Sequence, residues 1–301
     1  MSDVAIIIVN WNTGQLLADC IASIKALPEY DRVSLITVVD NNSTDDSLKR
    51  GEHIVDGDTK ISFVRSGENV GFARATNIGI RRIPADNTSH VLLLNPDTVV
   101  LPGSIATLLD SLSSDTERIG IVGPYLQYPD GTHQVSVRRF PTPLVLLVVF
   151  LKIQHMWPTL SFWRRYMAVD FDYTTRQAVD QVMGACFLIR HDLVQQIGVL
   201  DERFWVWFEE VDYCRRAITA GWQVYYIPES TVTHYGGVSF HQLTGLKKSW
   251  PFIRSGLQYA KKHFSYFTVC VLYIITPITV LLSLVAVLRH RILRSRNQKN
   301  L

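Results

Sequence analysis

Four short runs of aliphatic, largely β-branched residues in the first hundred positions constrain the fold of this chain most. They occupy residues 4–9, 34–39, 61–64 and 91–94. Such runs are typical of strands buried on both faces of a parallel sheet. Between them, apolar residues recur at helical spacing over 16–27 and 72–83. The alternation predicts an α/β fold with a mainly parallel, twisted sheet flanked by helices.

Polar side chains follow three of the predicted strands, at the point where each strand ends. Asn10 and Asn12 follow the first strand, Asp40 closes the second, and Asn95 and Asp97 follow the fourth. In an open α/β sheet, ligands bind beyond the carboxyl ends of the strands. We therefore expect the binding site to lie at that edge of the sheet.

Two of these carboxylates suit the chemistry of a nucleotide. Asp40 can accept hydrogen bonds from a base N–H or from ribose hydroxyls. Helix capping explains the polar residues 43–45 that follow, but it leaves Asp40 itself unexplained. Asp97 can hold Mg²⁺ or Mn²⁺ against a departing diphosphate, and a simple Pro-Asp turn explains the same residue equally well.

The densest group of reactive side chains lies in residues 201–212, where carboxylates are interleaved with aromatic residues. The carboxylates are Asp201, Glu202, Glu209, Glu210 and Asp212. Carboxylates at a helix N-terminus are favoured by the macrodipole, which is a purely structural explanation. Apolar neighbours, however, raise the pKa of a carboxylate and suit it to act as a general base. The aromatic density favours a site.

His234 belongs to a further candidate motif. It follows the β-like residues 230–233 and precedes Gly236 and Gly237. A single histidine is more often structural than a ligand. Because two glycines allow the backbone to approach a ligand closely, the functional and structural interpretations are equally good here.

The last sixty residues differ from the rest of the chain in charge. Residues 240–301 hold ten Lys or Arg and no Asp or Glu, whereas residues 1–239 hold 20 basic and 27 acidic residues. A basic segment on an acidic protein indicates an anionic partner. Because aliphatic residues crowd between the basic ones, we expect that partner to be membrane lipid and not nucleic acid.

Two segments are candidates for membrane contact. Residues 264–288 carry no charge and are long enough to span a bilayer. Basic residues flank both ends, so we favour a re-entrant hairpin that breaks at Pro277 over a single span. Residues 144–168 form either an interfacial insert or a core helix. The predicted organisation is an α/β domain over 1–240 and a membrane-attachment segment over 241–301.

Cysteine usage and the N-terminus indicate the cytosol. The four cysteines lie far apart, without the spacing of a zinc site or a disulfide framework. The chain enters an apolar strand at once, without the basic region and cleavage site of a secretory signal. Together with the tail, this predicts attachment to the cytoplasmic face of a membrane.

Seven motifs, taken in order, resemble those of the family 2 glycosyltransferases of GT-A fold, and most of all their rhamnosyltransferase-like bacterial branch. They run through residues 4–240 and read NWN, VVDNNSTD, ENVGFARATNIG, LLLNPDT, MGACFLIR, LDERFWVWFEEVDYCRR and THYGG. The resemblance implies an inverting enzyme that requires Mg²⁺ or Mn²⁺ and uses a nucleotide-diphospho-sugar as donor. Among donors it favours dTDP-rhamnose over UDP-sugars. It also implies synthesis of lipid-linked cell-surface glycans at the cytoplasmic face of the bacterial inner membrane.

The same resemblance implies roles for individual residues. Asp40 would bind the nucleotide base, and the other donor-binding residues would be Asn10, Asn12, Asn42, Asn69, Gly71, Asn77 and Asn95. Asp97 stands at the metal position of the family's DxD motif, with Asn95 in place of the first Asp, and His234 would contact metal or diphosphate. Glu210 stands at the catalytic-base position, where Asp is more usual, so Glu209 and Asp212 stay open as alternatives.

Residues for the acceptor are expected in two places. Asp201 and Trp207 belong to the carboxylate-aromatic cluster, and Arg138 and Arg139 could grip an acceptor pyrophosphate. A solvated pair beside a hairpin is the simpler explanation of the two arginines.

Two other functions fit parts of the sequence. A sugar-phosphate nucleotidyltransferase would need a glycine-rich phosphate loop after the first strand, where this chain has residues 10–13, Asn-Trp-Asn-Thr. A non-catalytic membrane-bound sugar-binding protein would need neither Asp97 nor Glu210.

Overall fold

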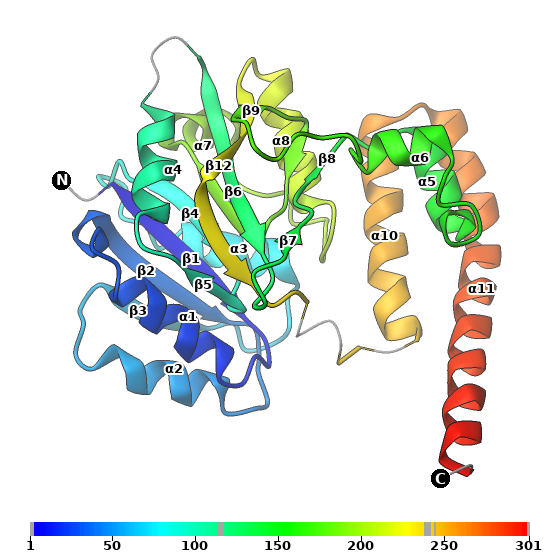
Figure 1. The fold of residues 1–301 in the computed structure, drawn as a ribbon, viewed down its shortest axis with the longest axis horizontal. Coiled ribbons are helices and arrows are strands. Elements are labelled where there is room, and N and C mark those ends of the chain that lie inside the picture. Colours follow the sequence, from blue (N-terminus) through cyan, green and yellow to red (C-terminus); the bar gives the residue numbers. More distant parts are fainter. Residues whose placement is uncertain (1–2, 114–116, 238–241, 244, 300–301) are drawn as a thin grey trace.

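The computed structural model describes residues 3–113, 117–237, 242–243 and 245–299, with side chains up to residue 285 in the last range. Within these residues, a ten-stranded sheet carries helices on both faces (Figure 1). Its strands are β1 (Val4–Asn10), β2 (Val33–Asp40), β3 (Ile61–Arg65), β4 (His90–Leu94), β5 (Thr98–Val100), β6 (Ile119–Gln127), β7 (His133–Gln134), β9 (Gln177–Ala178), β11 (Cys186–Ile189) and β12 (Gln223–His234). A small second sheet pairs β8 (Val137–Arg138) with β10 (Gln181–Val182).

The helices follow the same chain order. The α-helices are α1 (Leu16–Lys25), α2 (Ser47–Val55), α3 (Phe72–Ile80), α4 (Ser104–Leu112), α5 (Pro143–Phe150), α6 (Ser161–Tyr166), α7 (His191–Ile197), α8 (Glu209–Thr219), α10 (Leu246–His263) and α11 (Tyr266–Lys299), and the short 3₁₀ turns are η1 (Tyr30–Arg32) and η2 (Ile153–His155).

The α/β fold class predicted from the sequence is confirmed. Strands β3, β2, β1 and β4 lie side by side and pair in parallel, as the four apolar runs predicted. Beyond β4 the sheet becomes mixed, because β11 pairs antiparallel with both β4 and β6, and β5 pairs antiparallel with β12. The parallel half is therefore the part that strand-helix-strand units build.

Successive side chains of the central strands pack alternately into two hydrophobic cores, one on each face of the sheet. Ile6 and Ile8 of β1 belong to one buried cluster, together with Leu17 of α1. Ile7 points to the other face, where it joins a cluster that includes Tyr213 of α8. This alternation is the two-residue period of a strand with both faces covered, and it leaves only the strand ends available for ligands.

A helical unit of α5, α6, α10 and α11 lies beside the sheet (Figure 1). Leu146 of α5, Leu257 of α10 and Leu272 of α11 share a buried cluster with Phe208, which directly precedes α8. Part of segment 144–168 is thus buried against these helices, while Trp157 stays exposed. Whether this segment also contacts the membrane interface stays a prediction.

The predicted break at Pro277 is wrong. Helix α11 continues through Pro277 without interruption. Proline removes one backbone donor, which a long aliphatic helix tolerates when nearby hydroxyls bond neighbouring carbonyls. Here Thr276 Oγ1 donates to Leu272 O at 2.8 Å and Thr279 Oγ1 donates to Ile275 O at 3.2 Å.

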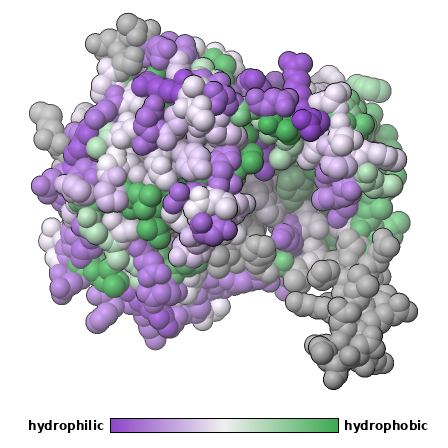
Figure 2. Space-filling model, in the orientation of Figure 1, coloured by the Kyte–Doolittle hydropathy of each residue, from purple (hydrophilic) through white to green (hydrophobic). Residues whose placement is uncertain are grey.

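One helix among the described residues is long and apolar enough to cross a membrane, and its apolar stretch covers Tyr266–Val285. Apolar surface gathers along the outer side of the helical unit (Figure 2). Its most exposed large side chains are Tyr266, Phe267, Ile274 and Leu281. The basic residues that follow position 288 lie outside the part whose side chains are described. A single span therefore replaces the hairpin as the expectation for this segment.

Candidate active site

A cavity of about 350 Å³ opens at the carboxyl ends of the parallel strands, where the sequence placed the binding site. We call it the strand-end cavity. It brings together nine residues singled out from the sequence: Asn69, Gly71, Asn95, Asp97, Arg138, Trp207, Glu209, Glu210 and His234. They come from five separate stretches of the chain, so the fold assembles them.

Asp97 and His234 face each other on one wall of the strand-end cavity. His234 Nε2 lies 3.3 Å from Asp97 Oδ1, and both side chains are buried. The contact follows from the sheet, since β12 ends at His234 against Thr98 of β5, and the Tyr235 N–H donates to Asp97 O at 2.9 Å. A carboxylate and an imidazole are thus held together by backbone pairing.

The tautomer of His234 suits a metal ligand. His234 Nδ1 lies 2.8 Å from Gln134 Oε1, and because this oxygen only accepts, Nδ1 carries the proton. In the neutral ring, Nε2 then presents a lone pair toward Asp97, with Asn95 Nδ2 3.5 Å away. A carboxylate oxygen and an imidazole nitrogen 3.3 Å apart are both of the atom types that bind divalent metal ions.

Within the described ranges, no group of three or more His, Cys, Asp or Glu side chains is arranged to hold a metal alone. Mg²⁺ in nucleotide sites is usually held by one or two protein ligands, and phosphate oxygens and water complete its coordination. The Asp97–His234 pair offers two such ligands.

Glu209 and Glu210 are the other two candidate catalytic residues that line the strand-end cavity. They are the first two residues of α8 and follow Trp207 and Phe208, whose φ angles are +63° and +70°. Two consecutive left-handed, non-glycine residues are strained, and such strain persists where surrounding structure fixes it. The strained turn directs both carboxylates toward the cavity.

Both carboxylates are prepared for proton transfer. Neither Glu209 Oε2 nor Glu210 Oε2, each buried, has a hydrogen-bond partner among the described residues. Burial raises the pKa of Glu209 well above its usual value, and the charge of Glu210 raises it further. Burial also raises the pKa of Glu210, which the charge of Arg138 partly offsets. Carboxylates with raised pKa values and an unsatisfied oxygen suit a general base.

The loop before α8 is tied to the donor side of the cavity through Gly71. The Phe72 N–H donates to Trp205 O at 2.6 Å, and a Cβ on Gly71 would overlap Trp205 O. Gly71 also has φ +85°, a conformation that favours glycine. The carboxylate loop and the start of α3 therefore hold each other in place.

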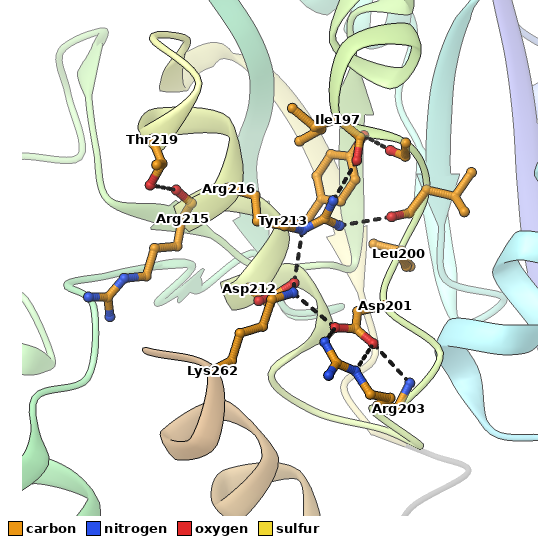
Figure 3. Close-up of polar contacts among 12 residues, drawn as sticks. Ile197, Leu200, Asp201, Arg203, Asp212, Tyr213, Arg215, Arg216, Thr219 and Lys262 are labelled. Carbon is orange, nitrogen blue, oxygen red and sulfur yellow. Dashed lines mark hydrogen bonds and ion pairs between the residues drawn. The ribbon is translucent and has the colours of Figure 1, made fainter. Parts of the chain in front are cut away.

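Asp212, the third candidate for the base, is not brought to the strand-end cavity. Its buried carboxylate accepts hydrogen bonds from Arg216 Nε at 3.0 Å and from Lys262 Nζ at 2.8 Å (Figure 3). A third hydrogen bond comes from His263 Nε2 at 2.7 Å. Burial would raise the pKa of Asp212, but these hydrogen bonds and charges outweigh it and lower the pKa. Two positions along a helix is about 200° of rotation, so Glu210 and Asp212 point to different sides.

Asp201 belongs to the same ion-pair group and not to the strand-end cavity. Its carboxylate accepts hydrogen bonds from Lys262 Nζ at 2.9 Å and from Arg203 (Figure 3). The hydrogen bond from Arg203 and the one from Lys262 outweigh its burial and lower the pKa of Asp201. Since Lys262 lies on α10, Asp201 and Asp212 connect the helical unit to the start of α8.

Five of the predicted donor residues lie outside the lining of the cavity. They are Asn10, Asn12, Asp40, Asn42 and Asn77. Asp40 accepts a hydrogen bond from Asn10 Nδ2 at 3.0 Å, and Asn12 Oδ1 accepts from the Thr44 N–H at 2.7 Å. Asn77 bonds the backbone of Leu200 in both directions, at 2.8 and 3.1 Å. In the structure Asn10, Asn12, Asp40 and Asn77 hold loops beside the cavity, whereas Asn42 is exposed.

The two arginines separate. Arg138 lines the strand-end cavity, whereas Arg139 lines a larger open cavity beside α6 and lies 3.8 Å from Asp180. The cavity residues that were not singled out from the sequence include Trp11, Asn41, Met183, Gly184 and Trp205. All five stand inside motifs quoted from the sequence, so membership of a motif was the available signal.

Comparison with known proteins places the chain in a family. The model of the family described as "Glycosyltransferase like family 2" matches residues 2–252. The chain is similar to the N-acetylglucosaminyl-diphospho-decaprenol L-rhamnosyltransferase of Mycobacterium tuberculosis (strain CDC 1551 / Oshkosh), with 29% identity over 78% of this chain and 77% of that protein. It is also similar to rhamnosyltransferase WbbL of Escherichia coli (strain K12), with 24% identity over 56% of this chain and 62% of that protein.

A solved structure shares the fold. The mannosyltransferase PcManGT of Pyrobaculum calidifontis, in complex with GDP-Man and Mn²⁺, superposes with a TM-score of 0.57 at 15% identity, over 94% of this chain and 74% of that one. The sheet and the flanking helices are therefore those of a GT-A fold. The chain belongs to the glycosyltransferase-like family 2.

Proposed function

We propose that this protein is a metal-dependent, inverting glycosyltransferase. It moves a sugar, with rhamnose favoured, from a nucleotide-diphospho-sugar to a hydroxyl of a lipid-linked glycan in cell-surface polysaccharide synthesis. The observation that carries the proposal is one cavity with the Asp97–His234 pair on one wall and two unsatisfied carboxylates, Glu209 and Glu210, on another. The similarity to two rhamnosyltransferases supports the sugar class.

The donor would lie along the asparagine side of the cavity. Asn69 and Gly71 line this side, and Asn41 joins them through a hydrogen bond from its Nδ2 to Asn69 Oδ1 at 3.1 Å. Asp97 and His234 would hold Mg²⁺ or Mn²⁺ at the diphosphate. When bound, this ion supplies positive charge that stabilises the departing nucleotide diphosphate.

The transfer itself needs one proton acceptor. Glu210 takes the proton from the acceptor hydroxyl, and the oxygen attacks the anomeric carbon from the face opposite the diphosphate. The new C–O bond forms as the bond to the diphosphate oxygen breaks, so the anomeric configuration inverts. Burial raises the pKa of Glu210, and the charge of Arg138 partly offsets that rise, which favours the ionised form that a base needs.

Membrane attachment fits this substrate class. The apolar stretch of α11 would hold the enzyme at the cytoplasmic face of the bacterial inner membrane, where nucleotide-sugars and lipid-linked acceptors meet. Helix α10 leads into this anchor, and its Lys262 and His263 bond Asp212 of the helix that carries Glu209 and Glu210.

A donor screen tests the proposal. With Mn²⁺ present, dTDP-rhamnose should stabilise the purified chain against thermal unfolding more than UDP-sugars do. At 100 times its dissociation constant, a ligand contributes about 2.7 kcal/mol to folding stability. EDTA should remove the effect, since Asp97 and His234 hold the diphosphate only through the metal. Absence of metal-dependent stabilisation by every nucleotide-sugar tried would reject the proposed donor class.

A further inference from the structure

A second cavity lies behind the strand-end cavity, between the helices that lead to the membrane. Its volume is about 370 Å³, and we call it the helical cavity. Phe150 of α5, Phe252 of α10 and Thr279 of α11 line it. Trp207 lines both cavities, so its indole lies between the helical cavity and the cavity that holds Glu209 and Glu210. Trp207 is held by an edge-on contact with Phe252, at 5.6 Å between ring centroids.

The polar groups of the helical cavity favour an anionic ligand. Lys152 and Lys248 line it together with His155, and its lining includes no Asp or Glu. In the part of the chain that the structure describes, no carboxylate forms an ion pair with Lys152. Partial burial of a lysine without a counter-charge costs free energy, which an anion in the cavity would recover.

Both the backbone conformation of Lys152 and the burial of its ammonium group are unfavourable for a lysine. Its φ is +57°, a left-handed conformation that is strained for a residue with a side chain. Burial lowers the pKa of its ammonium group, as expected for a lysine that has lost water without gaining a partner. The neighbouring Gln154, which also lines the cavity, has its buried Oε1 without a donor among the described residues.

The surroundings of the helical cavity indicate that the anion carries an apolar chain. Phe150, Phe252 and Ile253 supply apolar walls. Helix α11, which contributes Thr279 and Ser283 to the lining, presents the exposed apolar side chains Ile274, Ile278 and Leu281 on its outer surface. A lipid could therefore continue from the helical cavity along α11 without exposing its chain to water.

We propose that the helical cavity binds the diphosphate and the first isoprenoid units of a lipid-linked acceptor, with Lys152 and Lys248 as the diphosphate ligands. A sugar joined to this diphosphate would extend past Trp207 and bring its hydroxyl to Glu209 and Glu210. This inference rests on the proposed function, because it assumes an acceptor that is lipid-linked. A membrane phospholipid headgroup offers the same phosphate chemistry and is the competing occupant.

Farnesyl diphosphate is the probe that tests the subsite, because it holds the diphosphate and three isoprenoid units without any sugar. Binding is measured by titration calorimetry on the detergent-purified full chain in EDTA, so that no divalent ion can bridge the diphosphate to Asp97. The double variant K152Q/K248Q should bind about 10- to 100-fold more weakly, the loss expected for hydrogen bonds to charged groups. Lys152→Arg, which keeps the charge, should bind like the wild type.

The matched control is Lys247→Gln, which removes the same charge from the exposed neighbour of Lys248 on α10. Its affinity should stay within about 2-fold of the wild type, because Lys247 does not line the helical cavity. Equal affinity of K152Q/K248Q and wild type, or an equal loss in Lys247→Gln, would overturn the proposal.

Competition separates the two sources of phosphate. Phosphatidylglycerol in the same detergent should displace farnesyl diphosphate poorly. If it competes at equal concentration, the helical cavity is a phospholipid site and the proposal is wrong. Metal-dependent nucleotide-sugar binding is measured on the same samples and should be unchanged in K152Q/K248Q. If the wild type does not bind any nucleotide-sugar in the presence of metal, the proposed function is rejected. The calorimetry with farnesyl diphosphate tests only the proposed diphosphate subsite.

Discussion

Replacing Glu210 with Gln should lower kcat by about 10²–10⁴-fold and leave the affinity for the donor nearly unchanged. Gln keeps the shape of the side chain but cannot take the proton of the acceptor hydroxyl. The buried, unpartnered Oε2 of Glu210 is the group that would be lost. The measurement is steady-state transfer at saturating metal, with the donor concentration varied.

Glu209→Gln is the discriminating control, because Glu209 lines the same cavity and carries the same charge. We expect Glu209→Gln to lower kcat less than Glu210→Gln does. We also expect it to change the stability of the folded protein by an amount that depends on pH. The folded-state pKa of Glu209 lies above its unfolded value, so ionising this buried carboxyl as the pH rises through the folded pKa costs stability. Glu209→Gln should therefore stabilise the protein at pH 8 relative to wild type, but not at pH 4. If Glu209→Gln shows the larger loss of kcat, the base is Glu209.

Asp97→Asn should reduce metal-dependent turnover by at least about 10²–10³-fold, since a metal that stabilises a leaving diphosphate contributes several kcal/mol to the transition state. Asn keeps the size of the side chain and leaves His234 in place, but it removes the negative charge that attracts the ion. The fold should survive, because Asp97 lies in the turn between β4 and β5. The measurement is the transfer rate as a function of Mn²⁺ concentration, with circular dichroism as the check on folding.

Asp86→Asn serves as the matched control for charge, because Asp86 is exposed and lies before β4, outside the strand-end cavity. It should keep the wild-type rate and the wild-type metal dependence. A wild-type rate for Asp97→Asn at saturating Mn²⁺ would show that the Asp97–His234 pair does not hold the catalytic ion.

The strands, and the edge of the sheet at which the site lies, could be predicted because they depend on patterns within single segments of the sequence. A continuous apolar run such as residues 91–94 identifies a two-sided strand, and parallel strands bring their ends to one edge of the sheet. In the structure Asp97, Glu210 and His234 line one cavity, although 139 positions separate Asn95 from the histidine beside it.

The hydrogen-bond partners of individual carboxylates could not be predicted in the same way. Nothing near Asp212 in the sequence shows that its carboxylate bonds to Lys262 and His263 of α10, 50 and 51 positions away. Likewise, the motif that contains Asp40 does not show that Asn10, across the neighbouring strand, donates to it. At Pro277 the sequence does show the neighbouring hydroxyls of Thr276 and Thr279, but it does not show that they bond carbonyls of a helix that continues through the proline.

The product of the reaction tests the central claim most directly. The purified chain is incubated with Mn²⁺, a nucleotide-sugar from the donor screen and a prenyl-diphospho-N-acetylglucosamine, the acceptor type in the name of the Mycobacterium tuberculosis relative. NMR of the product then gives the configuration of the new glycosidic bond. Direct displacement assisted by one base predicts transfer that stops in EDTA and a configuration opposite to that of the donor. Retained configuration, or undiminished transfer in EDTA, would contradict the account.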